Sequence, residues 1–145
     1  MTAGARKTPC RWNFIGVSFH VMPSAVPLSA VSPDLVLSKA VLSVAARLDL
    51  RQRDLAAIIG ASEASVSRLQ RGRGIDPSSK EGELALLFVR MYRSLDTLVG
   101  GDDTRARVWL TAQNDHLGGM PVERLTSVQG LVDVVQYLDA MRGRL

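Results

Sequence analysis

The sequence predicts an all-α protein, and three observations support this. Apolar residues recur at three- and four-residue steps wherever a period can be read, no stretch alternates convincingly as a strand does, and serine, proline and glycine stand where helices would begin and end. The 145 residues with 46% hydrophobic content are enough for one compact domain or two small ones. We therefore expect an irregular arm followed by two helical units.

Residues 1–31 are expected to form the irregular arm, because they contain three prolines and no clear hydrophobic period. Basic residues precede apolar ones there, as in a signal peptide, but Asn13, His20 and Pro23 interrupt the apolar run. No window approaches the roughly 20 apolar residues of a membrane span. We therefore expect a cytoplasmic protein without a membrane partner, and Met22 is a second candidate start of the chain.

Charge is distributed unevenly along the chain, whose total net charge is +4. Residues 1–75 contain ten lysines and arginines against four acidic residues, a net charge of +6. Residues 76–145 contain eight against ten, a net charge of −2. The first half is therefore the one expected to meet a polyanion.

The first helix is expected to begin with Ser32 as its N-cap and Pro33 at its first position, where the missing N–H costs nothing. Its inward face is formed by apolar residues at helical spacing, namely Leu37, Val41, Val44 and Leu48. A second helix is expected from about Arg51 to Ile59. Gly60 ends it, because glycine adopts the left-handed conformation most cheaply.

A third helix is expected to begin after Ser62 and to run to about Arg71. Two helices joined by so short a turn must cross closely, which requires a small residue, a turn glycine and a β-branched apolar residue in that order. The sequence provides Ala56, Gly60 and Val66. The small core beneath this crossing is expected to contain Leu55, Ile59 and Leu69.

With Val66 and Leu69 turned inward, the outer side of the third helix carries only short or polar residues. Such a helix can seat deeply in the major groove of DNA. The residues expected to contact DNA from this side are Ser62, Glu63, Ala64, Ser65, Ser67 and Arg68. The flanking residues expected to hold phosphates are Arg51, Arg53, Arg71 and Arg73.

The residues of this helix pair resemble the helix-turn-helix of the Xre/Cro-like family. The matching positions are Gln52, Leu55, Ala56, Gly60, Ser62, Val66 and Ser67. The resemblance implies a DNA-binding domain over residues 32–75. A helical hairpin used only for packing would explain the apolar positions but not the basic surroundings. Glu63 departs from the neutral amide common in the family, and it repels phosphate unless it accepts from a cytosine amino group.

A polar linker, RGRGIDPSS, is expected to end the first unit near residue 76. Ser78 or Ser79 then opens a long helix that ends at Gly100-Gly101, with a stripe of Leu84, Leu87, Met91, Leu95 and Leu98. A shorter helix is expected over about Thr104–Gln113. Pro121 begins another, and Ser127 caps a last one whose apolar residues are Leu131, Val134, Val135, Leu138 and Met141.

No residues in the sequence form a recognisable catalytic or metal-binding set. Cys10 is the only cysteine and the two histidines, His20 and His116, have no clustered partners. The adjacent carboxylates of Asp102 and Asp103 are most simply a helix cap. We therefore expect neither an enzyme nor a cofactor.

The stretch WLTAQNDHLGGMPVERL, from Trp109 to Leu125, predicts a rigid helical corner, in which an asparagine closes one helix, paired glycines reverse the chain and a proline starts the next helix. It resembles the C-terminal toxin-binding domain of the MbcA/ParS/Xre antitoxins, which also has a small residue near Gly130. The resemblance implies a toxin-binding domain over residues 76–145. The toxin-binding residues expected on this basis and from the tail are Trp109, Asn114, Leu117, Gly119, Pro121, Arg142, Arg144 and Leu145.

This second resemblance also implies a partner, a RES-domain toxin that consumes NAD. The antitoxin would cover the toxin's active-site entrance, and the complex would repress its own operon. The basic tail with its carboxylate could enter a pocket built for an anionic dinucleotide, or it could be a frayed end. Two alternatives stay open: a stand-alone repressor whose second half only dimerises, and an inhibitor that no longer binds DNA. A homodimer is expected, because paired half-sites match a palindrome.

Overall fold

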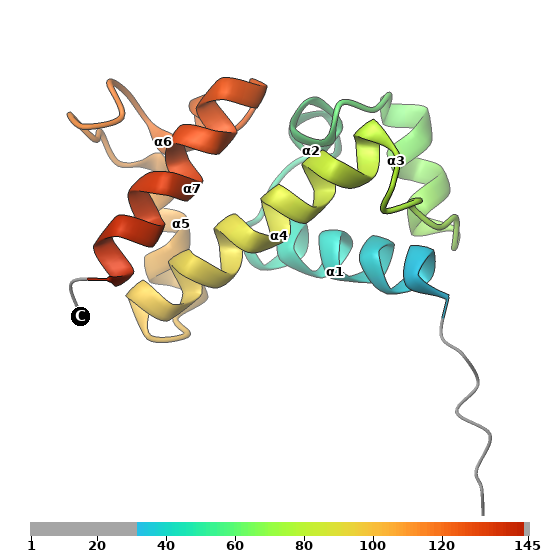
Figure 1. Cartoon of the computed structure of the whole chain (residues 1–145), viewed down its shortest axis with the longest axis horizontal. Coiled ribbons are helices and arrows are strands. Elements are labelled where there is room, and N and C mark those ends of the chain that lie inside the picture. Colours follow the sequence, from blue (N-terminus) through green and yellow to red (C-terminus); the bar gives the residue numbers. More distant parts are fainter. Residues whose placement is uncertain (1–31, 144–145) are drawn as a thin grey trace, which may run out of the picture.

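The computed structural model describes residues 32–143, and within them it contains seven α-helices and no β-strand (Figure 1). This confirms the all-α prediction. The predictions for the arm, Met22, Arg144 and Leu145 lie outside the described residues. Among the helices that are described, none has the length and apolar character needed to span a membrane. The helices are α1 Pro33–Arg47, α2 Gln52–Ile59, α3 Glu63–Gln70, α4 Lys80–Val99, α5 Asp103–Thr111, α6 Pro121–Arg124 and α7 Val128–Arg142.

Helix α4 connects the two ends of the molecule. It packs against α1 and α2 near one end and against α5 and α7 near the other (Figure 1). The buried residues of all these helices belong to one continuous hydrophobic cluster. The two halves of the chain therefore share α4 as a common support.

Helix α1 begins where the sequence predicts, but its cap differs from the expectation. Ser32 occupies the N-cap position and Pro33 follows it, yet the Ser32 side chain makes no capping hydrogen bond. Its backbone carbonyl accepts hydrogen bonds from the N–H groups of Leu35 and Val36 instead. The predicted inward face is confirmed, because its members are buried: Leu37, Val41, Val44 and Leu48.

The helix pair α2–α3 has the predicted crossing. Gly60 ends α2 with a left-handed backbone, φ 67°, and a Cβ at this position would lie 3.1 Å from Leu84 Cδ1 of α4. Ser62 caps α3, because its Oγ accepts the N–H of Ser65. The predicted small core is also confirmed by its burial, with Leu55, Ala56, Ile59, Val66 and Leu69 each at most 4% exposed.

The stripe predicted for α4 is confirmed in part. Met91 and Leu95 are buried, while Leu84, Leu87 and Leu98 are half-buried and pack against the core from its edge. The buried side of α4 contains Ala85, Phe88, Met91, Tyr92 and Leu95. Because other helices pack on both sides of α4, its core face cannot be read from one leucine stripe.

The segment between α3 and α4 is polar in sequence but is firmly packed. The Ile75 side chain is buried, and its N–H donates to the carbonyl of Asp34 in α1. A Cβ at Gly74 would lie 2.6 Å from Cβ of Asp34, so only glycine fits this approach. The segment therefore fastens α3 and α4 to the start of α1, and the domain boundary near residue 76 stays a prediction.

The corner between α5 and α7 is organised by side-chain caps. Asp102 accepts the N–H groups of Thr104 and Arg105, as predicted, and Ser127 accepts that of Gly130. Asn114 differs from its prediction, because α5 already ends at Thr111 and Ala112 is extended. The expectation that this asparagine closes the helix is therefore wrong.

Asn114 instead holds the turn that follows α5. Its Oδ1 accepts from the N–H groups of His116 and Leu117, and its backbone pairs with Gly119. Gly118 has a φ of 67° and Gly119 of 157°, conformations that favour glycine in so tight a reversal. Pro121 then begins α6, as predicted.

Candidate nucleic-acid and partner interfaces

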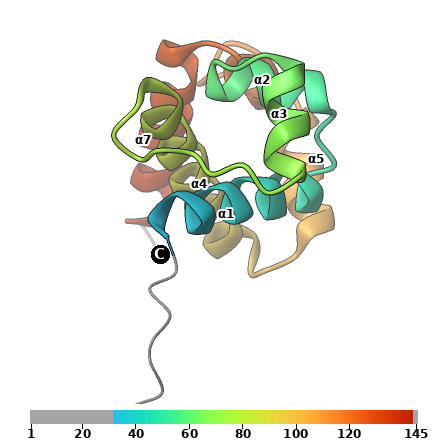
Figure 2. The ribbon, with the colours of Figure 1, turned by 90° about the vertical axis from the view of Figure 1, so that its right-hand side faces the viewer.

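Helix α3 presents a thin polar surface to the solvent. Ala64 and Arg68 are exposed, whereas Ser65 and Ser67 are half-buried at the edge of the same surface. In Figure 2, α3 lies on the side of the molecule that faces the viewer. The residues predicted to contact DNA are therefore not enclosed by the protein's own core.

A chain of hydrogen bonds runs along this surface from the cap to the arginine. The Ser62 hydroxyl lies 3.1 Å from the Ser65 hydroxyl, and an Arg68 terminal nitrogen donates to that hydroxyl at 3.3 Å. Nε of Arg68 also donates to the carbonyl of Ala64 at 3.3 Å. Because both arginine contacts are long and exposed, they stabilise this conformation only weakly, and the guanidinium can extend toward a ligand.

Gln52 ties the start of α2 to the start of α3. Its Nε2 donates to the carbonyl of Glu63 at 2.7 Å. The sequence pattern includes Gln52, but it assigns no role to that residue, because a contact across eleven residues appears only in the fold. The exposed Glu63 carboxylate lies in the first turn of α3, where the helix dipole favours a negative charge. This placement gives Glu63 a structural reason to be acidic.

The arginines predicted to flank α3 differ in their surroundings. Arg51 binds both carboxylate oxygens of Asp54, at 2.6 and 3.1 Å, and Arg53 lies 3.7 Å from the same carboxylate. The hydrogen bond from Arg51 lowers the pKa of Asp54 below its usual value. Part of the positive charge at the start of α2 is therefore neutralised within the protein.

The two arginines that follow α3 differ in their accessibility. Arg73 binds both oxygens of Glu81 in α4, at 2.5 and 2.6 Å, and its Nε is buried with no hydrogen-bond partner in the described structure. Arg71 is exposed and makes no ion pair with any described residue. Of these two predicted phosphate contacts, Arg71 is the accessible one, whereas Arg73 would have to leave Glu81.

The corner at the other end of the molecule presents an aromatic group. The rings of Trp109 and Tyr137 are stacked with centroids 6.2 Å apart, and the exposed His116 ring lies 5.9 Å from Tyr137. Trp109 is half-buried, while the preceding residue, Val108, is 62% exposed. This group joins α5, the glycine turn and α7 in one surface, which the sequence pattern could not reveal for Tyr137.

The other predicted toxin-binding residues divide by burial. Leu117 and Pro121 are buried, so they support the corner from inside, and Gly119 forms its tight turn. Arg142 is exposed near the end of α7, 3.8 Å from Asp139. The structure thus brings Trp109, Asn114 and Gly119 to one corner and places Arg142 on α7.

A polar cluster joins α1, α4 and the start of α5. The Tyr92 hydroxyl donates to Asp103 at 3.0 Å and accepts from Arg47 of α1 at 3.4 Å, while Arg47 lies 3.5 Å from Asp103. Burial, together with the hydrogen bond to Asp103, raises the pKa of Tyr92. The three residues belong to three different helices, so no local signal predicts this cluster.

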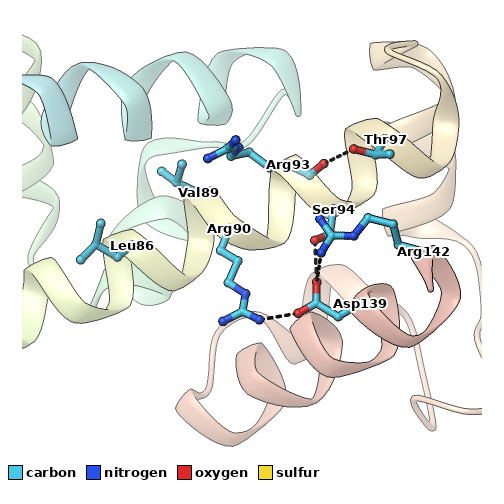
Figure 3. A pocket seen from close by; sticks show the side chains of 8 residues that line it. All are labelled: Leu86, Val89, Arg90, Arg93, Ser94, Thr97, Asp139 and Arg142. Atoms are coloured by element: carbon cyan, nitrogen blue, oxygen red, sulfur yellow. Dashed lines mark hydrogen bonds and ion pairs between the residues drawn. The ribbon is translucent and has the colours of Figure 1, made fainter.

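A shallow groove of about 460 Å³ lies between α4 and α7 (Figure 3). On one wall, Asp139 accepts from Arg90 at 2.6 Å and from the buried Ser94 hydroxyl at 2.7 Å. These two hydrogen bonds, first that of Ser94, lower the pKa of Asp139. The groove is lined by three arginines, Arg90, Arg93 and Arg142, against this single carboxylate.

Two family models match the chain. A model described as the antitoxin Xre-like helix-turn-helix domain matches residues 23–90, and one described as the antitoxin Xre/MbcA/ParS C-terminal toxin-binding domain matches residues 94–144. The chain carries both domains of an Xre-type antitoxin. Both matches agree with the resemblances read from the sequence. A search of curated proteins found no match.

The boundary between the two matched domains falls within α4. The helix-turn-helix match extends to Arg90 and the toxin-binding match begins at Ser94, so α4 contributes to both. These are families of antitoxins and DNA-binding regulators rather than of enzymes. The chain is thus an antitoxin of a toxin–antitoxin system with a DNA-binding domain.

Proposed function

We propose that this antitoxin binds a RES-domain toxin that consumes NAD, covers its active-site entrance, and represses its own operon through α3. It acts in the cytoplasm as a homodimer, without enzymatic activity or a cofactor. The observation that carries the proposal is the presence of the two antitoxin domains in one chain, each with an accessible surface. The RES identity of the toxin rests on the sequence resemblance alone.

The DNA-binding part is supported by the shape and charge of α3. Its exposed side has little bulk, which allows close approach to base edges, and Arg68 can extend from it toward a guanine or a phosphate. Arg71 is accessible beside it, and the short hydrogen bond from Gln52 holds the helix pair in register. Ser62, Ser65 and Ser67 are candidate hydrogen-bond donors to phosphates.

The toxin-binding part is supported by the aromatic corner. Trp109 is partly accessible and is braced by Tyr137, so it can present a large contact area without losing much freedom on binding. Val108 extends the apolar part of this surface. We propose that the toxin binds there, and that Arg142, Arg144 and Leu145 reach toward its anionic ligand site.

Co-expression tests this function. The antitoxin, produced together with the RES-domain protein of the same operon, is expected to restore growth and to co-purify with that protein. A matched pair of variants separates the two surfaces: Trp109→Ala should lose the rescue but keep operator binding, and Arg68→Ala should do the reverse. Failure of the unaltered antitoxin to rescue or co-purify would leave the alternative, a stand-alone dimeric repressor.

Operator binding is tested by its dependence on salt. If lysines and arginines contact phosphates, the logarithm of the affinity should fall linearly with the logarithm of the salt concentration. A flat response would argue against DNA binding and would favour an inhibitor that acts on the toxin alone.

A further inference from the structure

One face of α4 remains exposed along nearly the whole helix. Its residues follow each other at alternating steps of four and three, and from Glu83 onward all are exposed: Ser79, Glu83, Leu86, Arg90, Arg93 and Thr97. At about 100° per residue these positions fall within a narrow sector of the helix. This spacing is that of the seam along which two helices pack in a coiled coil. We call this set the α4 stripe.

The α4 stripe has an apolar centre between opposite charges. Leu86 is 48% exposed and is the one large apolar residue of the stripe. Glu83 lies one turn before it, and Arg90 and Arg93 lie after it. A surface with this order of charges is complementary to itself when two copies run in opposite directions.

A single antiparallel register satisfies every position of the stripe. When Glu83 of one copy faces Arg93 of the other, the same two-fold axis places Leu86 opposite Arg90 and Ser79 opposite Thr97. The aliphatic part of an arginine can cover a leucine while its charged end stays in water. Each contact occurs twice, as a two-fold interface requires.

The existing ion pairs of these residues are compatible with that register. Arg90 is already neutralised by Asp139, so its stem can pack on a leucine without a new partner. Arg93 makes no ion pair with the residues described, and Figure 3 shows it apart from Asp139. Glu83 binds only the highly exposed Lys80, in a surface pair that contributes little and can exchange.

We propose that a second copy of this chain docks antiparallel on the α4 stripe, with Glu83 of each protomer bound to Arg93 of the other. This inference rests on the homodimer of the proposed function and names its surface. The groove between α4 and α7 receives the partner's side chains beside the seam. Residues 1–31 do not suit this place, because they contain basic residues and no acidic ones.

Charge reversal tests the proposal in the full chain, with the dimer dissociation constant measured by sedimentation equilibrium. Glu83→Arg and Arg93→Glu should each weaken the dimer by about tenfold or more, because each creates two like-charge contacts. The double variant should recover most of the lost affinity. Most diagnostic is an equal mixture of the two single variants, which should form a mixed dimer, since both of its contacts then join opposite charges.

A matched control is Asp115→Arg, which makes the same change of charge in the exposed turn after α5 and should leave the dimer unchanged. Circular dichroism confirms that each variant is folded. A dimer that is insensitive to both reversals, or a mixture that fails to recover, overturns the α4 interface while leaving the homodimer intact. If the unaltered chain stays monomeric, both the α4 interface and the homodimer are overturned. Toxin rescue and salt-dependent operator binding then test the toxin-binding and DNA-binding parts of the proposed function separately.

Discussion

The Gln52 side-chain amide donates a 2.7 Å hydrogen bond to the backbone carbonyl of Glu63. This bond joins the first residues of α2 and α3 and fixes the angle at which α3 is presented. Replacement of Gln52 by leucine, which keeps the bulk but removes the donor, should weaken operator binding by about fivefold, since a lost hydrogen bond contributes about 1 kcal/mol. The measurement is fluorescence anisotropy on operator DNA at fixed salt. An unchanged affinity would show that the bond has no part in presenting α3.

Arg68 and Arg73 should respond in opposite ways to alanine substitution. Arg68 is exposed on α3, so Arg68→Ala should relax the preference for operator over random DNA with little loss of stability. Arg73 is bound to Glu81, so Arg73→Ala should lower the free energy of unfolding by about 1 kcal/mol and leave the sequence preference intact. Competition binding and urea unfolding measure the two effects. A relaxed preference in the Arg73 variant would assign it the base contact instead.

Gly130 should not tolerate a side chain. A Cβ there would lie 2.2 Å from the carbonyl oxygen of Arg124, so Gly130→Ala must displace the α6–α7 turn and should cost about 1–3 kcal/mol of stability. Gly143→Ala is the matched control, because its nearest atom would be 3.6 Å away. Thermal unfolding compares the two. Equal melting temperatures would contradict the close packing at the start of α7.

Asp139 should make stability depend on acid pH. Ser94 and Arg90 lower the pKa of Asp139 in the folded state, so its contribution is complete above the unfolded pKa of about 3.9 and is lost as pH falls through the lower folded value. Asp139→Asn should therefore flatten the fall of stability below about pH 5 and lower the plateau above it. Urea midpoints across this range measure the effect. If the stability of the variant and that of the unaltered chain fell in parallel as the pH is lowered, Asp139 would not be a source of the pH dependence.

Much of the first unit could be predicted from local signals. Pro33, Gly60 and Ser62 mark helix ends because their effects on the backbone are local, and the structure places each at the predicted boundary. The face of α4 could not be predicted in the same way, because helices pack on several of its sides. Phe88 is fully buried beside the predicted leucine stripe, and only the packing of the neighbouring helices decides that this side of α4 is the deeper one.

The candidate sites, too, contain features that local sequence predicts and features that depend on contacts between helices. The exposed side of α3 follows from the spacing of its two apolar residues, Val66 and Leu69, which turn inward, so the sequence could predict it. The pairing of Arg73 with Glu81, and the stacking of Trp109 on Tyr137, depend on contacts between separate helices. Such contacts leave no local pattern in the chain. The roles of Arg51, Arg53 and Arg73 in phosphate binding stay predictions, because each of these arginines lies beside a carboxylate of the protein itself.

Toxin binding by the aromatic corner is tested most directly by the amount of RES-domain toxin retained by tagged antitoxin, compared between the unaltered chain, Trp109→Ala and Arg68→Ala. We expect stoichiometric retention by the unaltered chain and by Arg68→Ala, and about a tenfold loss or more for Trp109→Ala, whose truncation removes the central aromatic contact. Equal retention by all three, or none by the unaltered chain, would contradict the assignment of toxin binding to the aromatic corner.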